Sequence, residues 1–320
     1  MKTSTTLTFA LILAGLGVYY FAGEKYSPAP LGELSPVEVL LLAPEDRVTW
    51  FQIENLKTKE TVALRRAESG WRLENPVSYP AEDLLARGMV AALARAKRLR
   101  RFPFNAHTAL PKDLGLAPPS LRIAVETEKD PKRKYLWVGE DSPIGRMVYA
   151  RWEGEQEYFL APPEFRSVFE RTAYSLRRKK LFRVNWEGVA WIEAKGPKRQ
   201  YRLERNGKVW RAILPDRQVE IPLEKVTDLI YAFQSLYVKD FLDGKNPSNH
   251  ELRLREGGAS LALGAGEGTL EKLFLGASAK NQDALYACRE KEDLVLLVSE
   301  SNLRALWTQL DLVFRGLSVS

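Results

Sequence analysis

Cysteine, histidine and methionine are scarce in this chain, and their scarcity excludes whole classes of chemistry. The 320 residues include one cysteine, Cys288, two histidines, His107 and His250, and three methionines. A single cysteine excludes an intramolecular disulfide and any multi-cysteine metal site. Two histidines leave little scope for histidine-based zinc ligation. Cys288 lies in the strand-like run Leu285–Arg289, where a small buried thiol is expected. The sequence therefore predicts no metal and no cofactor.

A large excess of either charge is also missing. The chain has 48 basic and 41 acidic residues, a net charge of +7, and 45% hydrophobic residues, the composition of a globular protein. A nucleic-acid interface needs basic residues clustered on one face, not a modest surplus. Of three basic runs, Arg95–Arg101 and Arg177–Arg183 close expected helices, and Lys129–Lys134 lies in a hairpin turn. We predict solvated charge there and no nucleic-acid partner, with anionic lipid headgroups as the alternative partner.

After residue 23 the sequence has no apolar run of membrane length, but one precedes it. Leu7–Ala22 reads LTFALILAGLGVYYFA, and as a helix residues 3–23 would span roughly 31 Å, about one bilayer core. The region around Phe21–Gly23 matches a signal-peptidase site poorly, and no cysteine follows to carry a lipid. We predict a retained anchor over residues 1–25 and a linker over 26–44, with a cleaved signal peptide as the alternative.

The charges beside this run indicate its orientation. Lys2 precedes it, whereas Glu24 and Lys25 cancel just after it. Positive charge favours the cytoplasmic side. We therefore expect a single-pass protein of the cell inner membrane, with a cytoplasmic N-terminus and extracytoplasmic modules.

The rest of the chain contains one pattern twice. Several core and turn residues recur after 139 positions, and Gly139 and Tyr149-Ala150 recur after 137 as Gly276 and Tyr286-Ala287. Self-similarity at a nearly fixed offset indicates a duplicated structural unit. We predict module 1 over residues 45–182 and module 2 over 183–316. The pairs separated by 139 are Ile53-Glu54 and Ile192-Glu193, Leu64 and Leu203, Trp71-Arg72 and Trp210-Arg211, Pro76 and Pro215, and Phe102 and Phe241.

Each module alternates between strand and helix patterns. Asn206-Gly207 between two β-rich runs is a strong hairpin signal. Pro80 and Pro222 each precede a helical apolar stripe, the first of which continues to Leu99 and has basic residues in its last turns. Further strands are expected, including one over residues 251–255, and closing helices over 164–176 and 301–314. The predicted class is α+β: two related modules, each a mostly antiparallel sheet with two helices.

The order of several segments resembles a known family. A Gly70-Trp71 strand is followed by Asp113–Leu121 (DLGLAPPSL), Trp137–Gly145 (WVGEDSPIG), Val148–Arg151 (VYAR) and Ser175–Phe182 (SLRRKKLF). This order is similar to the bacterial family catalogued as domain of unknown function 4340 (DUF4340). The resemblance is dense in module 1 and thin in module 2, where Asp243–Ser248 replaces the Leu-Gly-Leu segment. It implies tandem, membrane-anchored modules and a link to ABC-type transport systems, including gliding motility, but no catalytic residues.

No catalytic site is predicted from the remaining candidates. Gly264–Gly268 lies between two strand-like runs, so we expect a hairpin instead of a phosphate loop. The loop Gly139–Gly145 lacks the lysine of a Walker motif, and we interpret it as a turn. Neither histidine has a recognisable nucleophile partner. The alternating Glu153, Glu155 and Glu157 are interpreted as a solvated hairpin face.

These patterns together predict a non-enzymatic protein. Its expected function is to bind, as an anchored extracytoplasmic accessory protein, to an ABC-type transporter or an envelope assembly. The alternative is an enzyme that modifies an envelope polymer or lipid, with its site between the two modules.

Overall fold

The chain forms two separate structural units. The computed structural model describes residues 38–39, 47–103, 110–143, 146–254, 258–315 and 317. Contacts divide the chain after Leu176, six residues before the boundary expected from sequence. The segment after it belongs to module 2, because the Leu181 amide donates to the Leu236 carbonyl at 3.0 Å and the Val238 amide donates to the Lys179 carbonyl at 2.7 Å.

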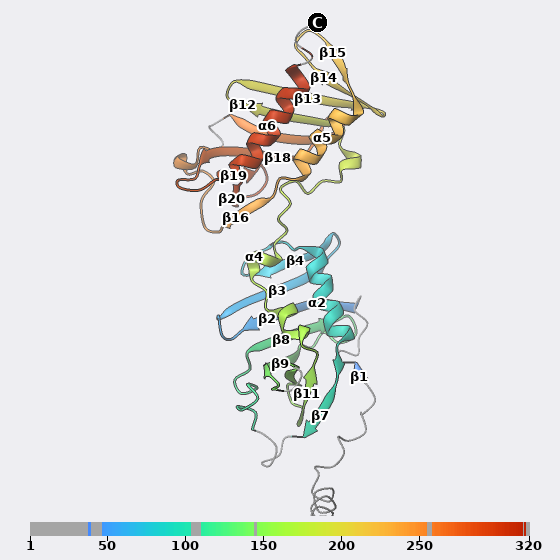
Figure 1. Cartoon of the computed structure of the whole chain (residues 1–320), viewed down its shortest axis with the longest axis vertical. Helices are drawn as coiled ribbons and strands as arrows, with labels where there is room; N and C mark the ends of the chain where they lie inside the picture. The colour runs from blue at the N-terminus through green and yellow to red at the C-terminus, as the bar shows by residue number, and fades with distance from the viewer. Residues whose placement is uncertain are drawn as a thin grey trace, which may run out of the picture. The chain divides into compact units, whose positions relative to one another are not determined.

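Module 1 is a nine-stranded antiparallel sheet with its helices on one face (Figure 1). A separate two-stranded ladder joins β1 (Glu38–Val39) to β6 (Lys97–Arg98). The helices are α2 (Asp83–Arg95), α3 (Glu164–Phe169) and α4 (Ala173–Leu176). In spatial order the strands are β5 (Tyr79–Pro80), β4 (Gly70–Asn75), β3 (Glu60–Ala67), β2 (Val48–Asn55), β8 (Leu121–Thr127), β9 (Lys134–Asp141), β10 (Val148–Trp152), β11 (Glu157–Ala161) and β7 (Arg100–Pro103).

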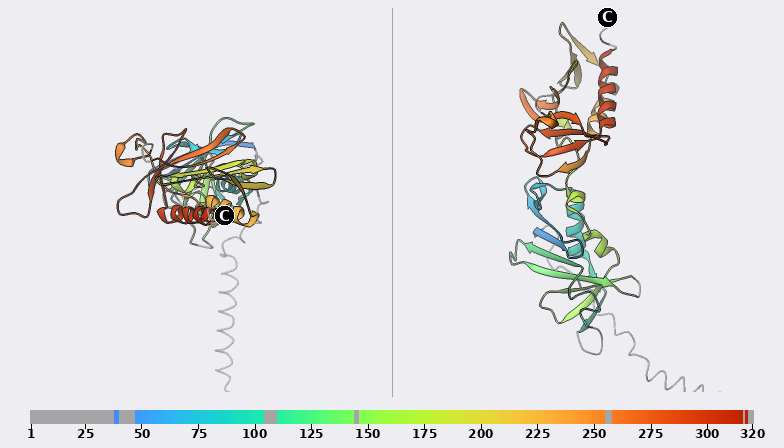
Figure 2. Two further views of the ribbon diagram at one scale, coloured as in Figure 1. Left: turned by 90° about the horizontal axis from the view of Figure 1, so that it is seen from above. Right: turned by 90° about the vertical axis from the view of Figure 1, so that its left-hand side faces the viewer.

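Module 2 repeats this strand order position for position. Its helices are α5 (Leu223–Gln234) and α6 (Glu300–Arg315), with short 3₁₀ turns η2 (Trp186–Gly188) and η3 (His250–Leu252). Both views of Figure 2 show α6 along one face of the sheet. In spatial order the strands are β15 (Gln218–Ile221), β14 (Val209–Ile213), β13 (Arg199–Asn206), β12 (Trp191–Gly196), β17 (Ala259–Ala265), β18 (Gly268–Ser278), β19 (Leu285–Arg289), β20 (Val295–Val298) and β16 (Val238–Leu242).

The pairing registers also agree between the modules. Ala150 pairs with Val138 in module 1, and Ala287 pairs with Leu275 in module 2. Both residues of the pair are shifted by 137 positions. Two tandem modules of mostly antiparallel sheet, each with a small number of helices, are therefore confirmed.

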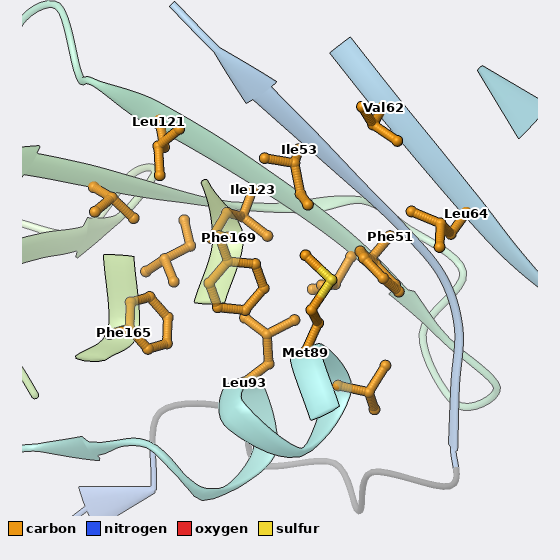
Figure 3. Close-up of a cluster of buried hydrophobic side chains, with 14 of the residues drawn as sticks. Phe51, Ile53, Val62, Leu64, Met89, Leu93, Leu121, Ile123, Phe165 and Phe169 are labelled. Carbon is orange, nitrogen blue, oxygen red and sulfur yellow. The ribbon is translucent and has the colours of Figure 1, made fainter. Parts of the chain in front are cut away.

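The core of module 1 lies between the sheet and its helices (Figure 3). Alternate residues of a strand face the same side, so Phe51 and Ile53 of β2 point toward the helices together. Met89 and Leu93, one helical turn apart on α2, meet them, and both are at most 2% exposed. Phe165 and Phe169 of α3 complete the core, with ring centroids 5.0 Å apart.

A loop crosses the opposite face of each sheet and explains why one glycine recurs. A Cβ on Gly139 would lie 2.2 Å from the Leu114 carbonyl oxygen, and a Cβ on Gly276 would lie 2.1 Å from that of Leu252. No side chain fits where a covering loop approaches a strand this closely. Leu252–Leu254 is therefore the counterpart of Leu114–Leu116, and the assignment of Asp243–Ser248 to that role was wrong.

Three other local expectations were wrong. Helix α2 ends at Arg95, and the basic residues after it form β6 and β7, because β7 completes the sheet by pairing with β11. Within the expected strand over residues 251–255, the described residues 251–254 are not a strand: His250–Leu252 forms a 3₁₀ turn. The closing helix of module 1 is interrupted between Phe169 and Ala173, whereas that of module 2 is continuous.

The expected anchor, residues 1–25, lies outside the described residues, as does almost all of the expected linker and His107. Within the described part of the chain, no helix combines the length and apolar character needed to span a bilayer.

Candidate functional site

An apolar groove lies between α2 and α3 in module 1. Its volume is about 420 Å³. Arg95, Lys97 and Glu164 supply its charged lining. Leu99 and Val168 contribute to an apolar lining that also includes Gly88, Ala91, Ala92, Ala96, Pro162 and Phe165.

The groove exists because α2 presents small residues toward α3. Met89 and Leu93 point into the core, and the neighbouring positions on the groove side are Gly88, Ala91 and Ala92. A Cβ added to Gly88 would meet no atom within 4 Å. Small side chains on one helix leave a hollow when the facing helix does not move closer to fill the space.

A second hollow continues along the same helix. Its volume is about 360 Å³, and it shares Gly88 and Ala91 with the groove. Asp83, at the start of α2, accepts a hydrogen bond from the Trp71 amide at 3.0 Å and pairs with Arg87 at 2.5 Å. Leu84 also lines this hollow and is 79% exposed. The solvent side of α2 is therefore an extended, partly apolar surface.

Module 2 has a charged hollow of about 290 Å³ on β18 and β19. Arg289 is 3% exposed, and its Nε lies 2.8 Å from Glu271 Oε1. Its Nη2 donates to the Leu181 carbonyl at 2.8 Å. Arg183 donates its amide to Glu271 at 2.7 Å and pairs through its guanidinium with Glu292. Because these side chains pair with one another and with the backbone of Leu181 and Arg183, the cluster holds the segment that follows Leu176 against the sheet of module 2.

The candidate sites considered in the sequence lie in a hairpin and in ion pairs. Gly264–Gly268 is the β17–β18 hairpin, as expected, with Gly266 in the left-handed region at φ +54°. Glu155 pairs with Arg98 at 3.4 Å, and Glu157 pairs with Arg101 at 3.7 Å. Two of the three alternating glutamates are therefore paired with arginines.

The basic runs are also engaged in ion pairs. In the β8–β9 turn, Arg133 pairs with Glu126 at 2.9 Å and Lys134 pairs with Asp130 at 3.1 Å. The Lys134 hydrogen bond lowers the pKa of the Asp130 carboxyl below its ordinary value. Arg177, 3% exposed, holds Asp243 through two hydrogen bonds of 3.0 and 2.7 Å. These runs stabilise turns and the start of module 2.

Within the described ranges, no three histidine, cysteine or carboxylate side chains are placed to hold a metal ion. His250 lies in η3, and Cys288 is buried in β19. The groove beside α2, which sequence reasoning missed, is thus the candidate site. Its only signal was the group of small residues at Gly88, Ala91 and Ala92, which resembles an ordinary solvent face until the position of α3 is known.

The fold and the groove define a class: a tandem, sheet-based protein with an open, partly apolar groove in module 1 and paired charges in module 2. The family model for "Domain of unknown function (DUF4340)" matches residues 71–256, more than half of the chain. The chain belongs to this family. The match begins in β4 of module 1 and extends past η3 of module 2, so it includes parts of both modules. No curated protein and no solved structure matches the chain.

Proposed function

We propose that this protein is a membrane-anchored, extracytoplasmic accessory protein that binds a membrane transporter or an envelope assembly. Residues 1–25 act as the anchor, and the two modules carry the binding surfaces. A tether of this kind raises the effective concentration of the modules at any partner in the same membrane.

The observation that supports this proposal is that each module has exposed apolar residues on a helix. Leu84 on α2 is 79% exposed, Leu223 on α5 is 70% exposed and Tyr231 on α5 is 66% exposed. Leu223 and Tyr231 are eight residues apart, a spacing that places both on one side of a helix. Exposed apolar residues on one side of a helix favour binding. In the charged hollow of module 2, by contrast, arginine and glutamate side chains of the lining are already paired with one another.

Recovery of partners from detergent-solubilised membranes tests this function. We expect the full chain to co-purify with membrane proteins, and the double variant Leu223→Ser, Tyr231→Ser to lose them by about tenfold or more. Leu270→Ser is the matched control, because Leu270 is also exposed, at 48%, but lies on β18. Repeated recovery of the wild-type chain without any membrane protein would contradict the proposal.

The proposed topology has its own test. Protease added to intact cells with a permeabilised outer envelope should digest the modules but leave a cytoplasmic control protein whole. Protection of the modules under these conditions would place them on the cytoplasmic side and would exclude an extracytoplasmic role.

A further inference from the structure

We propose that the groove between α2 and α3 binds one anionic membrane lipid. An acyl chain lies along the apolar lining, and the headgroup lies against Arg95 and Lys97. This inference rests on the proposed anchoring of residues 1–25, because the anchor keeps module 1 near a bilayer.

The lining of the groove suits a flexible hydrocarbon chain. Ala92, Ala96, Leu99, Phe165 and Val168 all contribute to it. None of these side chains has a polar group that would orient a rigid ligand, and a chain of methylene groups needs none. Burial of apolar area from water supplies the binding energy.

The charges at the groove favour an anion. Arg95 and Lys97 are both exposed and line it, and Glu164 is the single carboxylate among the lining residues. Arg100, at the start of β7, adds a further exposed cation close in sequence. Lysine and arginine near a bilayer surface attract anionic headgroups. The charge therefore selects an anionic lipid over a zwitterionic one.

The groove lies where the N-terminal part of the chain joins module 1. Val39 of β1 pairs with Lys97 of β6, and Lys97 lines the groove. Twelve residues, 26–37, separate this ladder from the end of the proposed anchor. Fully extended, they reach at most about 40 Å. A bilayer that holds the anchor is therefore within reach of the groove.

Photo-crosslinking with lipid probes tests the proposal on the full chain. The protein is reconstituted in phosphatidylcholine vesicles that contain a small fraction of phosphatidylglycerol with a photoreactive group on its acyl chain. We expect crosslinks in the peptides of α2 and α3, at least fivefold above those from a photoreactive phosphatidylcholine at the same fraction. Equal crosslinking by the two probes would overturn the proposal.

Three variants separate the apolar and charged parts of the site. Gly88→Leu fills the groove where an added Cβ meets open space, and it should abolish the α2 and α3 crosslinks. Arg95→Glu with Lys97→Glu should lower them more than tenfold, since each cation contributes roughly fivefold. Lys225→Glu, an exposed cation on α5, is the matched control and should leave them unchanged.

Other outcomes identify a different occupant or a failed anchor. If Gly88→Leu lowers the unfolding temperature and leaves the lipid crosslinks intact, another part of this chain fills the groove and the proposal is wrong. If crosslinks appear only in residues 3–23, the anchor is correct but the groove does not bind lipid. If the chain does not float with the vesicles at all, the anchoring itself fails and this inference fails with it.

Discussion

Modules 1 and 2 share one strand order but differ in how they use equivalent positions. At the end of β10, Trp152 pairs with Leu136, and at the end of β19, Arg289 pairs with Leu273. Trp152 is 9% exposed and belongs to the apolar core, whereas Arg289 is 3% exposed and bonds to Glu271. The sheet tolerates either side chain because its backbone pairing is the same, so the duplicated scaffold leaves individual sites free to differ.

The helix layers differ in a similar way. Helix α6 runs without a break from Glu300 to Arg315, while its counterpart is divided into α3 and α4. Asp311 of α6 accepts hydrogen bonds from Tyr201 and from Arg199, the latter at 2.7 Å. Burial and the Asp311 hydrogen bond raise the pKa of Tyr201 above its ordinary value. Module 2 thus holds its closing helix firmly, and module 1 has the open groove.

The largest expected effect comes from Arg289. Arg289→Met should destabilise module 2 by about 4 kcal/mol, because it leaves the Glu271 carboxylate, 11% exposed, without its closest cation. Hydrogen exchange of module 2 amides measures this, and module 1 should be unchanged. Arg304→Met is the control, since Arg304 is 74% exposed in its pair with Glu300. A loss below about 1 kcal/mol would mean that the charged cluster does not hold module 2 together.

The two crossing glycines should respond alike. Gly139→Ala and Gly276→Ala should each cost about 3 kcal/mol, because the new methyl group would overlap a loop carbonyl. Urea denaturation monitored by hydrogen exchange in each module gives both values. Gly188→Ala, where a Cβ meets nothing within 4 Å, should be nearly neutral. Effects of very different size in the two modules would break the structural equivalence.

Gly115 and Arg253 provide a test of backbone strain. They lie at the centre of the equivalent covering loops, with φ of +62° and +52°. Glycine adopts this left-handed region without cost, whereas a residue with a side chain loses about 1 kcal/mol. Arg253→Gly should therefore stabilise module 2 by about 1 kcal/mol, as measured by its urea midpoint. A destabilised variant would show that the Arg253 side chain contributes more than its backbone conformation costs.

The smallest effect concerns the start of α6. Asp283 accepts hydrogen bonds from the Ser301 amide at 3.0 Å and the Ser301 hydroxyl at 2.7 Å. The Ser301 hydroxyl bond, followed by those of Ser299 and the Ser301 amide, lowers the pKa of Asp283 below its ordinary 3.8. A lowered carboxyl pKa stabilises the fold above about pH 4 and ceases to do so as pH falls through the folded-state value.

Asp283→Asn mimics the protonated carboxyl. Its urea midpoint should lie slightly below that of the wild type at pH 7, and the difference should shrink by pH 3. In module 1, the N-cap of α3, Pro163, makes no side-chain cap hydrogen bond. A difference that is independent of pH would exclude the carboxylate as its origin.

Several features were predictable from patterns along the sequence. The recurrence of Trp71 and Trp210, and of Gly139 and Gly276, indicated two copies of one fold, and the strand orders agree. The Asn206-Gly207 hairpin and α6 also follow their local patterns. Hairpins and amphipathic helices depend on neighbouring residues, so the sequence contains their signals directly.

Elements that depend on distant partners were not predictable. The apolar stripe of α2 continues to Leu99, but the helix ends at Arg95 because β7 joins the edge of the sheet beside β11. Residues 251–255 have strand-like composition, yet Leu252 and Leu254 pack across the sheet as part of a loop. In both cases long-range contacts outweighed local propensity.

By itself, the sequence determined that the chain contains a duplicated sheet-based fold, because spacing and residue type repeat along it. The tertiary structure alone decided that Arg289 would form ion pairs with Glu271 and Glu292 and that α2 would border a groove. Both features arise where side chains from separate elements meet. Small residues on a helix border a groove only when another helix lies opposite them, and buried charges become stable only when partners from elsewhere in the chain pack against them.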